Sequence, residues 1–130
     1  MNINIIILSI VVPSITFSAP EGGVYIVNET FPVTFVCSAT GIPPPTILWL
    51  RGDLLLDPIM NDTVNSRFLL SNAIVSMAPR EVSTVTRMLT LNNAMDSDNG
   101  TYTCQANNTA VGGEDQEDFE LFVQGELLKL

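Results

Sequence analysis

Residues 96–104, DSDNGTYTC, place an aspartate, a glycine, a tyrosine and a cysteine at alternate positions. Successive side chains of a β-strand point to opposite faces, so Asp98, Gly100, Tyr102 and Cys104 share one face of a strand formed here. One face of such a strand normally packs against a core. The alternation therefore predicts that Tyr102 and Cys104 are buried, with partners supplied by distant parts of the chain.

Short stretches of β-branched and aromatic residues recur beyond residue 20, separated by Gly, Pro, Asn and Asp and without a long helical period. Seven short strands indicate an all-β fold, a two-sheet antiparallel sandwich. The length of 130 residues fits one such domain. The predicted strands are residues 24–27, 32–39, 46–51, 68–76, 83–91, 100–107 and 118–124.

Parity along these strands predicts which side chains face inward. Cys37 shares its face with Val33, Phe35 and Ala39, and a bond to Cys104 turns both cysteine-bearing faces toward the core. The remaining predicted inward residues are apolar or aromatic: Ile47, Trp49, Leu89, Leu91, Ala106, Leu121 and Val123.

The first eighteen residues have no charged side chain, and the run from Ile5 to Val12 is apolar except at Ser9. This run is shorter than the roughly 20 apolar residues that span a bilayer, but it is typical of a secretory signal peptide. We expect residues 1–18 to be a signal peptide cleaved after Ser18; the alternative is an apolar first strand. Residues 19–124 then form the domain, and 125–130 form a short tail or the start of a linker, without a membrane span.

The only two cysteines, Cys37 and Cys104, follow this predicted signal peptide. Secreted proteins fold in an oxidising compartment, so one disulfide and a secreted or extracellular location are expected. Two buried thiols are the alternative.

The net charge of −9, with only five basic residues, excludes the cationic surface that nucleic acid or anionic lipid requires. The chain has no histidine, so it lacks the commonest general base and metal ligand. No catalytic residue and no cofactor are predicted. DSDNG is a poor calcium loop because Gly100 occupies the place of the third ligand. The acidic residues 113–118 are expected to form a solvated loop, and the prolines at 43–45 a turn.

Cys37, Trp49 and the run from Asp98 through Gly100 and Tyr102 to Cys104 together resemble the signature of an immunoglobulin domain, over about residues 20–124. TGIPPPTILW at 40–49 and the A-x-N at 106–108 are similar to the intermediate set of cell-adhesion molecules and receptor ectodomains. The glycines that usually follow come late, at 112 and 113, which indicates a longer loop between the last two strands.

The resemblance implies roles for two polar residues of the signature. Tyr102 is expected to donate a hydrogen bond to backbone at the corner between the fifth and sixth strands. Asp98 is expected to form a partly buried salt bridge with Arg67, which occupies the start of the fourth strand.

Four sequons, at Asn28, Asn61, Asn99 and Asn107, fall in predicted turns or at strand ends. In a secreted protein we expect at least two of them to be glycosylated, with chance matches as the alternative. A glycan on Asn107 would lie at the end of the outward face of residues 100–107.

Parity leaves Leu48, Leu50 and Phe122 pointing outward, with the leucines of residues 53–57 close by. These side chains predict one contiguous apolar patch that binds a protein partner, either another copy or a different protein. The alternative is that these are scattered, singly exposed apolar side chains.

A spacer in a longer extracellular array is the rival function. Carbohydrate binding is weaker, because Tyr25 and Trp49 are the only large rings with polar edges and Trp49 is predicted to be core.

Overall fold

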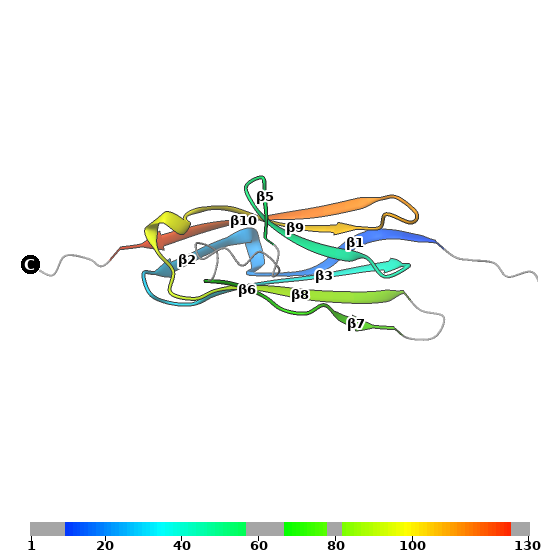
Figure 1. The fold of residues 1–130 in the computed structure, drawn as a ribbon, viewed down its shortest axis with the longest axis horizontal. Helices are drawn as coiled ribbons and strands as arrows, with labels where there is room; N and C mark the ends of the chain where they lie inside the picture. The colour runs from blue at the N-terminus through cyan, green and yellow to red at the C-terminus, as the bar shows by residue number, and fades with distance from the viewer. Residues whose placement is uncertain (1–9, 57–66, 78–81, 126–130) are drawn as a thin grey trace, which may run out of the picture.

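Two β-sheets pack face to face in the computed structural model, which describes residues 10–56, 67–77 and 82–125 (Figure 1). The first sheet has the order β1-β3-β8-β6, with β7 also paired to β8, and the second has the order β2-β10-β9-β4-β5. The first sheet contains β1 (Val11–Ala19), β3 (Val33–Ile42), β6 (Phe68–Leu70), β7 (Ile74–Ser76) and β8 (Ser83–Leu91). The second contains β2 (Val24–Asn28), β4 (Thr46–Arg51), β5 (Leu54–Leu56), β9 (Gly100–Asn107) and β10 (Glu114–Gln124).

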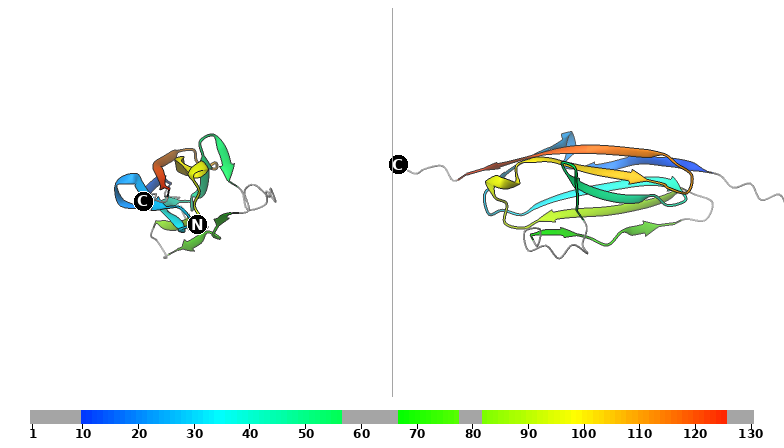
Figure 2. Two further views of the ribbon diagram at one scale, coloured as in Figure 1. Left: turned by 90° about the vertical axis from the view of Figure 1, so that its left-hand side faces the viewer. Right: turned by 45° about the horizontal axis from the view of Figure 1, so that its top comes forward.

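All neighbouring strands are antiparallel except β2 and β10, which run parallel. Two short 3₁₀ helices, η1 (Glu21–Gly23) and η2 (Asp96–Asp98), lie in the connections β1–β2 and β8–β9. The layered arrangement and the elongated shape are visible in Figure 2, with β1 beginning at one end of the long axis and β10 ending at the other.

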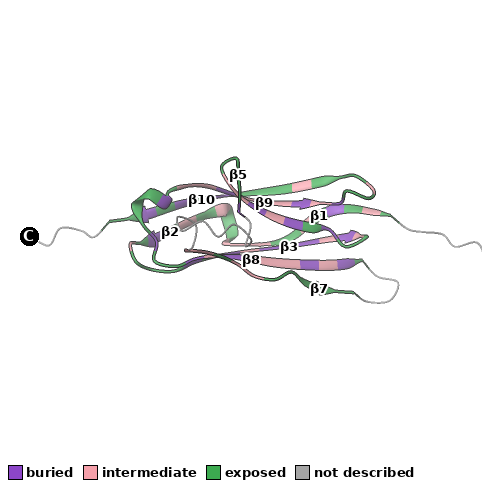
Figure 3. Cartoon of the chain, viewed as in Figure 1, coloured by how far each residue is buried: buried purple, intermediate pink, exposed green. Residues whose placement is uncertain are grey.

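The core lies between the sheets and contains the side chains that parity assigned to it (Figure 3). Phe35 is at its centre, with its ring centroid 5.3 Å from Tyr102 and 5.4 Å from Phe119. Cys37 and Cys104 form the predicted disulfide between the sheets. The predicted all-β sandwich is therefore confirmed, along with the inward positions of the residues given above.

The predicted strand at residues 68–76 is two strands, β6 and β7, because Ser71 interrupts it. The Ser71 N–H donates to the carbonyl of Met88, and the Ser71 hydroxyl accepts from the Met88 N–H at 2.9 Å. The side chain thereby replaces a backbone partner in the ladder, and residues 71–73 leave the regular strand.

The acidic residues 114–118 belong to β10, so the expectation of a solvated loop there is wrong. Glu114 to Asp118 pair with Asn107 to Thr103 of β9. Side chains of β9 also donate to two of these carboxylates, Gln105 to Glu114 at 2.9 Å and Thr103 to Asp118 at 2.7 Å. Charge alone predicts a loop, but these cross-strand hydrogen bonds stabilise an acidic strand.

The first strand that the structure describes begins at Val11, eight residues before the predicted domain boundary, because residues 11–19 form β1 and pair with β3. Pro13 is buried and Ile15 packs against the core. Cleavage after Ser18 would leave β3 without this neighbour. Residues 11–18 thus form an apolar first strand, which is the alternative given above. The signal peptide itself stays a prediction.

No helix within the described ranges is long and apolar enough to cross a membrane.

Candidate binding face and its structural support

The corner between β8 and β9 is built around the carboxylate of Asp98, which has no solvent exposure. Arg67, directly before β6, donates two hydrogen bonds to it, one to each oxygen at 2.8 Å. The Met95 N–H donates a third at 2.7 Å. The Tyr102 hydroxyl donates to the backbone carbonyl of Asp98 at 2.7 Å. Both interactions that the resemblance implied, the ion pair and the tyrosine hydrogen bond, are present.

These contacts shift the pKa values of the corner. Burial raises the pKa of the Asp98 carboxyl, but the hydrogen bonds from Arg67 and Met95 and the charges of Arg67 and Arg51 outweigh burial, so the pKa lies below its usual value of 3.8. The hydrogen bond to Asp98 raises the pKa of Arg67. Burial raises the pKa of Tyr102 to about 12. Asp98 is therefore ionised and Tyr102 is neutral at physiological pH. The Asp98 carboxylate forms an ion pair with Arg67.

The three arginines of the described residues all make contacts within the domain. Arg51 lies 5.8 Å from the ring centre of Phe68 and donates to the carbonyl of Ser97. Arg87 is at an inward position of β8 and reaches across to the carbonyl of Ile47 on β4 at 3.0 Å. Arg67 pairs with Asp98. Arg87 thus links the two sheets, while Arg51 and Arg67 bind groups at the corner between β8 and β9.

The outer face of the second sheet has two apolar groups separated by a polar stripe. Leu48 and Leu50 on β4 are half-buried, and Leu50 lies opposite Leu55 of β5. Phe122 on β10 is 51% exposed and lies opposite Ile26 of β2, which is 60% exposed. β9 lies between the two groups, so Leu48 and Leu50 do not form one continuous patch with Phe122.

The polar stripe consists of threonine and glutamine side chains of β9 bonded to carboxylates of β10. Thr101 donates to Glu120 at 2.6 Å, and Thr103 donates to Asp118 at 2.7 Å. Gln105 donates to Glu114 and continues the stripe toward the far end of the sheet. These hydrogen bonds fix acidic groups on the face that the sequence predicts as apolar.

Three of the four predicted glycosylation sites are described, and all belong to the second sheet or the turn before it. Asn28 ends β2 and is exposed, and Asn107 ends β9. Asn99 is exposed, and its side-chain oxygen accepts from the Val123 N–H at 2.5 Å, which leaves the amide nitrogen toward solvent with one long bond to Asp96. Asn61 lies outside the described residues.

Two residues of this arrangement, Ile26 and Arg87, are absent from the predicted site. The alternation of residues 24–27 is a signal that could have identified Ile26 as outward, and the structure places it opposite Phe122 on the neighbouring strand. Arg87 occupies an inward position between Val85 and Leu89, where a charged residue must find a polar partner.

Comparison with known proteins places this geometry in a family. A family model described as an immunoglobulin domain matches residues 12–108. The chain belongs to the immunoglobulin domain family. The match begins inside the predicted signal peptide and includes most of β1. The intermediate-set subtype stays a prediction.

Hemicentin-1 of Mus musculus is 35% identical over 117 residues, which make up 90% of this chain and 2% of that relative. The human peroxidasin homolog is 41% identical over 58 residues, 42% of this chain and 4% of the relative. The chain thus spans only a small part of the curated relatives that it matches.

Solved immunoglobulin structures share the fold. Titin domain M7 superimposes with a TM-score of 0.67 at 20% identity, covering 89% of this chain and 97% of that one. A chain of the complex between titin M10 and an immunoglobulin domain of obscurin-like 1 gives 0.61 at 22% identity, covering 88% and 96%. These likenesses concern the fold alone.

Proposed function

We propose that this chain is an extracellular immunoglobulin module that binds another protein through the outer face of the sheet β2-β10-β9-β4-β5. The observation that supports this function is the pair Phe122 and Ile26, which lie side by side on neighbouring strands and are both more than half exposed. Aromatic and aliphatic side chains of this kind are the usual anchors of protein interfaces. Leu48, Leu50 and Leu55 provide a second apolar group across the sheet.

The polar stripe indicates what kind of partner fits. Asp118, Glu120 and Glu114 lie between and beside the apolar groups, and the described arginines are all bound within the domain. Two copies that met through this face would therefore oppose carboxylates without compensating cations. A different protein with apolar side chains and nearby lysines or arginines fits better.

The proposed extracellular location rests on the disulfide and on the sequons. A buried disulfide persists in an oxidising compartment. Glycosylation of at least two of the four sequon asparagines is part of this proposal. A glycan on Asn107 would restrict the face at the end of β9, away from Phe122, which is two residues from the C-terminal end of β10.

A substitution of Phe122 tests the proposed face. The chain would be displayed as a multivalent probe against a panel of extracellular proteins, and Phe122→Glu should lose the binding of the parent. Phe31→Glu is the matched control, because Phe31 is exposed to a similar extent, 55%, in the turn between β2 and β3. Equal binding by the parent and both variants would rule out the outer face. Added salt should weaken the parent interaction if the partner is basic.

A spacer is the second candidate function, and one observation favours it. β1 begins at one end of the long axis and β10 ends at the other, so domains could be joined in a row (Figure 1). The small share of hemicentin-1 that the match spans fits the same arrangement. A spacer would show no partner for the isolated chain, and Phe122→Glu would leave the interactions of a longer protein unchanged.

Carbohydrate binding has less support. Trp49 is fully buried, and the ring of Tyr25 packs 5.8 Å from that of Phe35. Neither ring is available as a platform for a sugar.

A further inference from the structure

The strand β7, Ile74–Ser76, lies at the edge of the first sheet and is exposed along its whole length (Figure 3). Ile74 and Val75 are consecutive, so their side chains point to opposite faces of the strand. Both are nevertheless exposed, by 59% and 46%, and Met77 follows with 68%. Val75 lies opposite the buried Val85 and therefore has the inward-facing position, yet it is not part of the core. β7 thus extends beyond the part of the first sheet that the second sheet covers.

The backbone of β7 has one neighbour among the described strands, which is β8. Alternate residues of an edge strand direct their N–H and C=O groups away from the sheet, where another strand can bind them. Proteins usually protect such edges with charged residues, proline or bulges. Residues 68–77, FLLSNAIVSM, contain no charged residue and no proline. We call this segment the β7 edge.

Charge indicates which partner the β7 edge fits. Two copies of a chain with a net charge of −9 repel each other, so contact between them is least unfavourable where carboxylates are absent. The outer face of the second sheet has Glu114, Asp118 and Glu120, whereas the β7 edge has none. It is thus a surface on which like-charged copies can meet.

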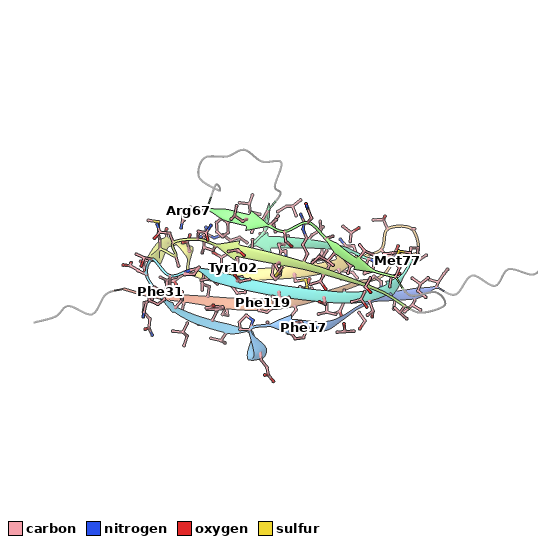
Figure 4. All side chains as sticks on the ribbon, turned by 90° about the horizontal axis from the view of Figure 1, so that it is seen from below. Phe17, Phe31, Arg67, Met77, Tyr102 and Phe119 are labelled. Atoms are coloured by element: carbon pink, nitrogen blue, oxygen red, sulfur yellow. A yellow bond between two sulfur atoms is a disulfide. The ribbon has the colours of Figure 1, made fainter. Side chains whose placement is uncertain are left out.

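The three sequons that the structure describes also lie away from this surface. Asn28, Asn99 and Asn107 are on β2, before β9 and at the end of β9, and none of these three is on β6, β7 or β8. Figure 4 shows Met77, directly after β7, near one end of the domain and far from Arg67.

We propose that the β7 edge pairs with the β7 edge of a second copy, in an antiparallel arrangement about a two-fold axis near Val75. Antiparallel pairing of one strand with itself is the self-complementary contact that a two-fold dimer requires. It would join the first sheets of two copies into one continuous sheet and cover Ile74 and Val75. This homophilic contact is independent of the proposed face at Phe122, which lies on the other sheet.

Sedimentation of the 130-residue chain tests the proposal. A short edge buries little area, so association is weak and the concentration should range up to about 1 mM. We expect a monomer–dimer equilibrium that strengthens as sodium chloride screens the repulsion between the two acidic copies. A contact held by opposite charges would instead weaken with salt. A monomer at every concentration and salt level would overturn the proposal.

Matched substitutions locate the contact. Val75→Lys places two like charges at the two-fold axis and should weaken dimerisation at least tenfold; Ile74→Lys is the second variant if the first fails to fold by circular dichroism. Ile26→Lys, at an exposed position of the edge strand β2, changes the net charge by the same amount and should leave the dimer intact. Loss of the dimer in Ile26→Lys but not in Val75→Lys would place the contact on the other sheet and overturn the proposal.

Cross-linking gives a readout that does not depend on affinity. A Val75→Cys variant should form a disulfide-linked dimer under mild oxidation, because opposed residues near the axis have Cβ atoms about 5 Å apart. Ile26→Cys should remain largely monomeric under the same conditions. Equal cross-linking of both variants would mean random collision and would contradict the proposed pairing.

Discussion

The first sheet has two edges, β1 and the β7 edge, and they are protected in very different ways. β1 is nine residues long, contains the buried Pro13, and shifts its register twice against β3. Its Ile15 N–H donates to the Asp115 carboxylate of the other sheet at 2.7 Å. β7 is three residues long and exposed on both faces. One apolar edge is thus covered by contacts within the domain, while the other has no comparable covering contact among the described residues.

Glycine positions show how closely β1 is packed. A Cβ atom on Gly113 would lie 3.1 Å from the Pro13 side chain, and one on Gly41 would lie 3.3 Å from the Val11 carbonyl oxygen. The end of β3 at Gly41 and the turn before β10 at Gly113 thus approach β1 at distances that only glycine permits without adjustment. This close packing indicates that β1 is an integral part of the sandwich.

The ion pair between Arg67 and Asp98 anchors the start of the β7 edge, and its loss should destabilise the domain most. Asp98→Ala leaves Arg67 without its buried partner and should lower the free energy of unfolding by about 4 kcal/mol. Asp96→Ala, an exposed carboxylate two residues earlier, should change it by less than about 0.5 kcal/mol. Urea unfolding at pH 7 measures both. Similar losses in the two variants would mean that the ion pair does not anchor this edge.

Removal of β1 should have the next largest effect. A chain beginning at residue 19 loses the packing of Ile15 and its hydrogen bond to Asp115, and should be less stable than a chain beginning at residue 10 by about 3 kcal/mol. Thermal and urea unfolding of the two chains give the difference. If they are equally stable, β1 does not close its edge, and cleavage after Ser18 has no structural cost.

Acid should weaken the same anchor without a mutation. The folded pKa of Asp98 lies below its usual value of 3.8, so the ionised carboxylate stabilises the fold at higher pH, and this contribution is lost as the pH falls below 3.8 through the folded pKa. Stability measured between pH 7 and pH 2 should fall in that window. In the Asp98→Ala variant, stability should fall less over this pH range than in the parent. If the variant and the parent lose stability equally, the effect does not come from Asp98.

The bond that ties β1 to the second sheet can be removed alone. Asp115→Ala should lower the free energy of unfolding by about 1.5 kcal/mol, because the Ile15 N–H loses a charged acceptor. Glu117→Ala, an exposed carboxylate on the same strand, is the control and should have little effect. Hydrogen exchange at Ile15 is the second measurement, and exchange should become faster only in Asp115→Ala.

A substitution in β7 should change the free energy of unfolding least. Val75→Thr keeps the β-branched shape and should change the stability of the monomer by less than about 0.5 kcal/mol, because Val75 makes no core packing. Urea unfolding at low protein concentration is the measurement. A loss above 1 kcal/mol, on the order of a buried Val truncation, would mean that β7 is closed within the domain after all.

Sequence-based prediction was most accurate where burial follows local alternation. Phe35, Cys37, Tyr102 and Cys104 lie on strands whose two faces differ sharply, so period-two parity identified the core. The corner at Asp98 was predictable for a different reason, since its residues form a recognisable motif. Parity also placed Phe122 outward, although it could not show that β9 would separate it from Leu50.

Short-range alternation and the signature residues Cys37, Trp49 and Asp98 to Cys104 were enough to predict the two-sheet sandwich, the disulfide and the corner. The different roles of the two apolar edges, in contrast, could be seen only in the folded structure. Residues 11–18 and 68–77 are both apolar and uncharged. Whether such a segment is covered depends on residues far away in the chain. For β1 these are the Asp115 carboxylate and the backbone of Gly113, and no residue of comparable effect is found among the described neighbours of β7. Hydrophobicity is a property of the segment, whereas burial is a property of what packs against it.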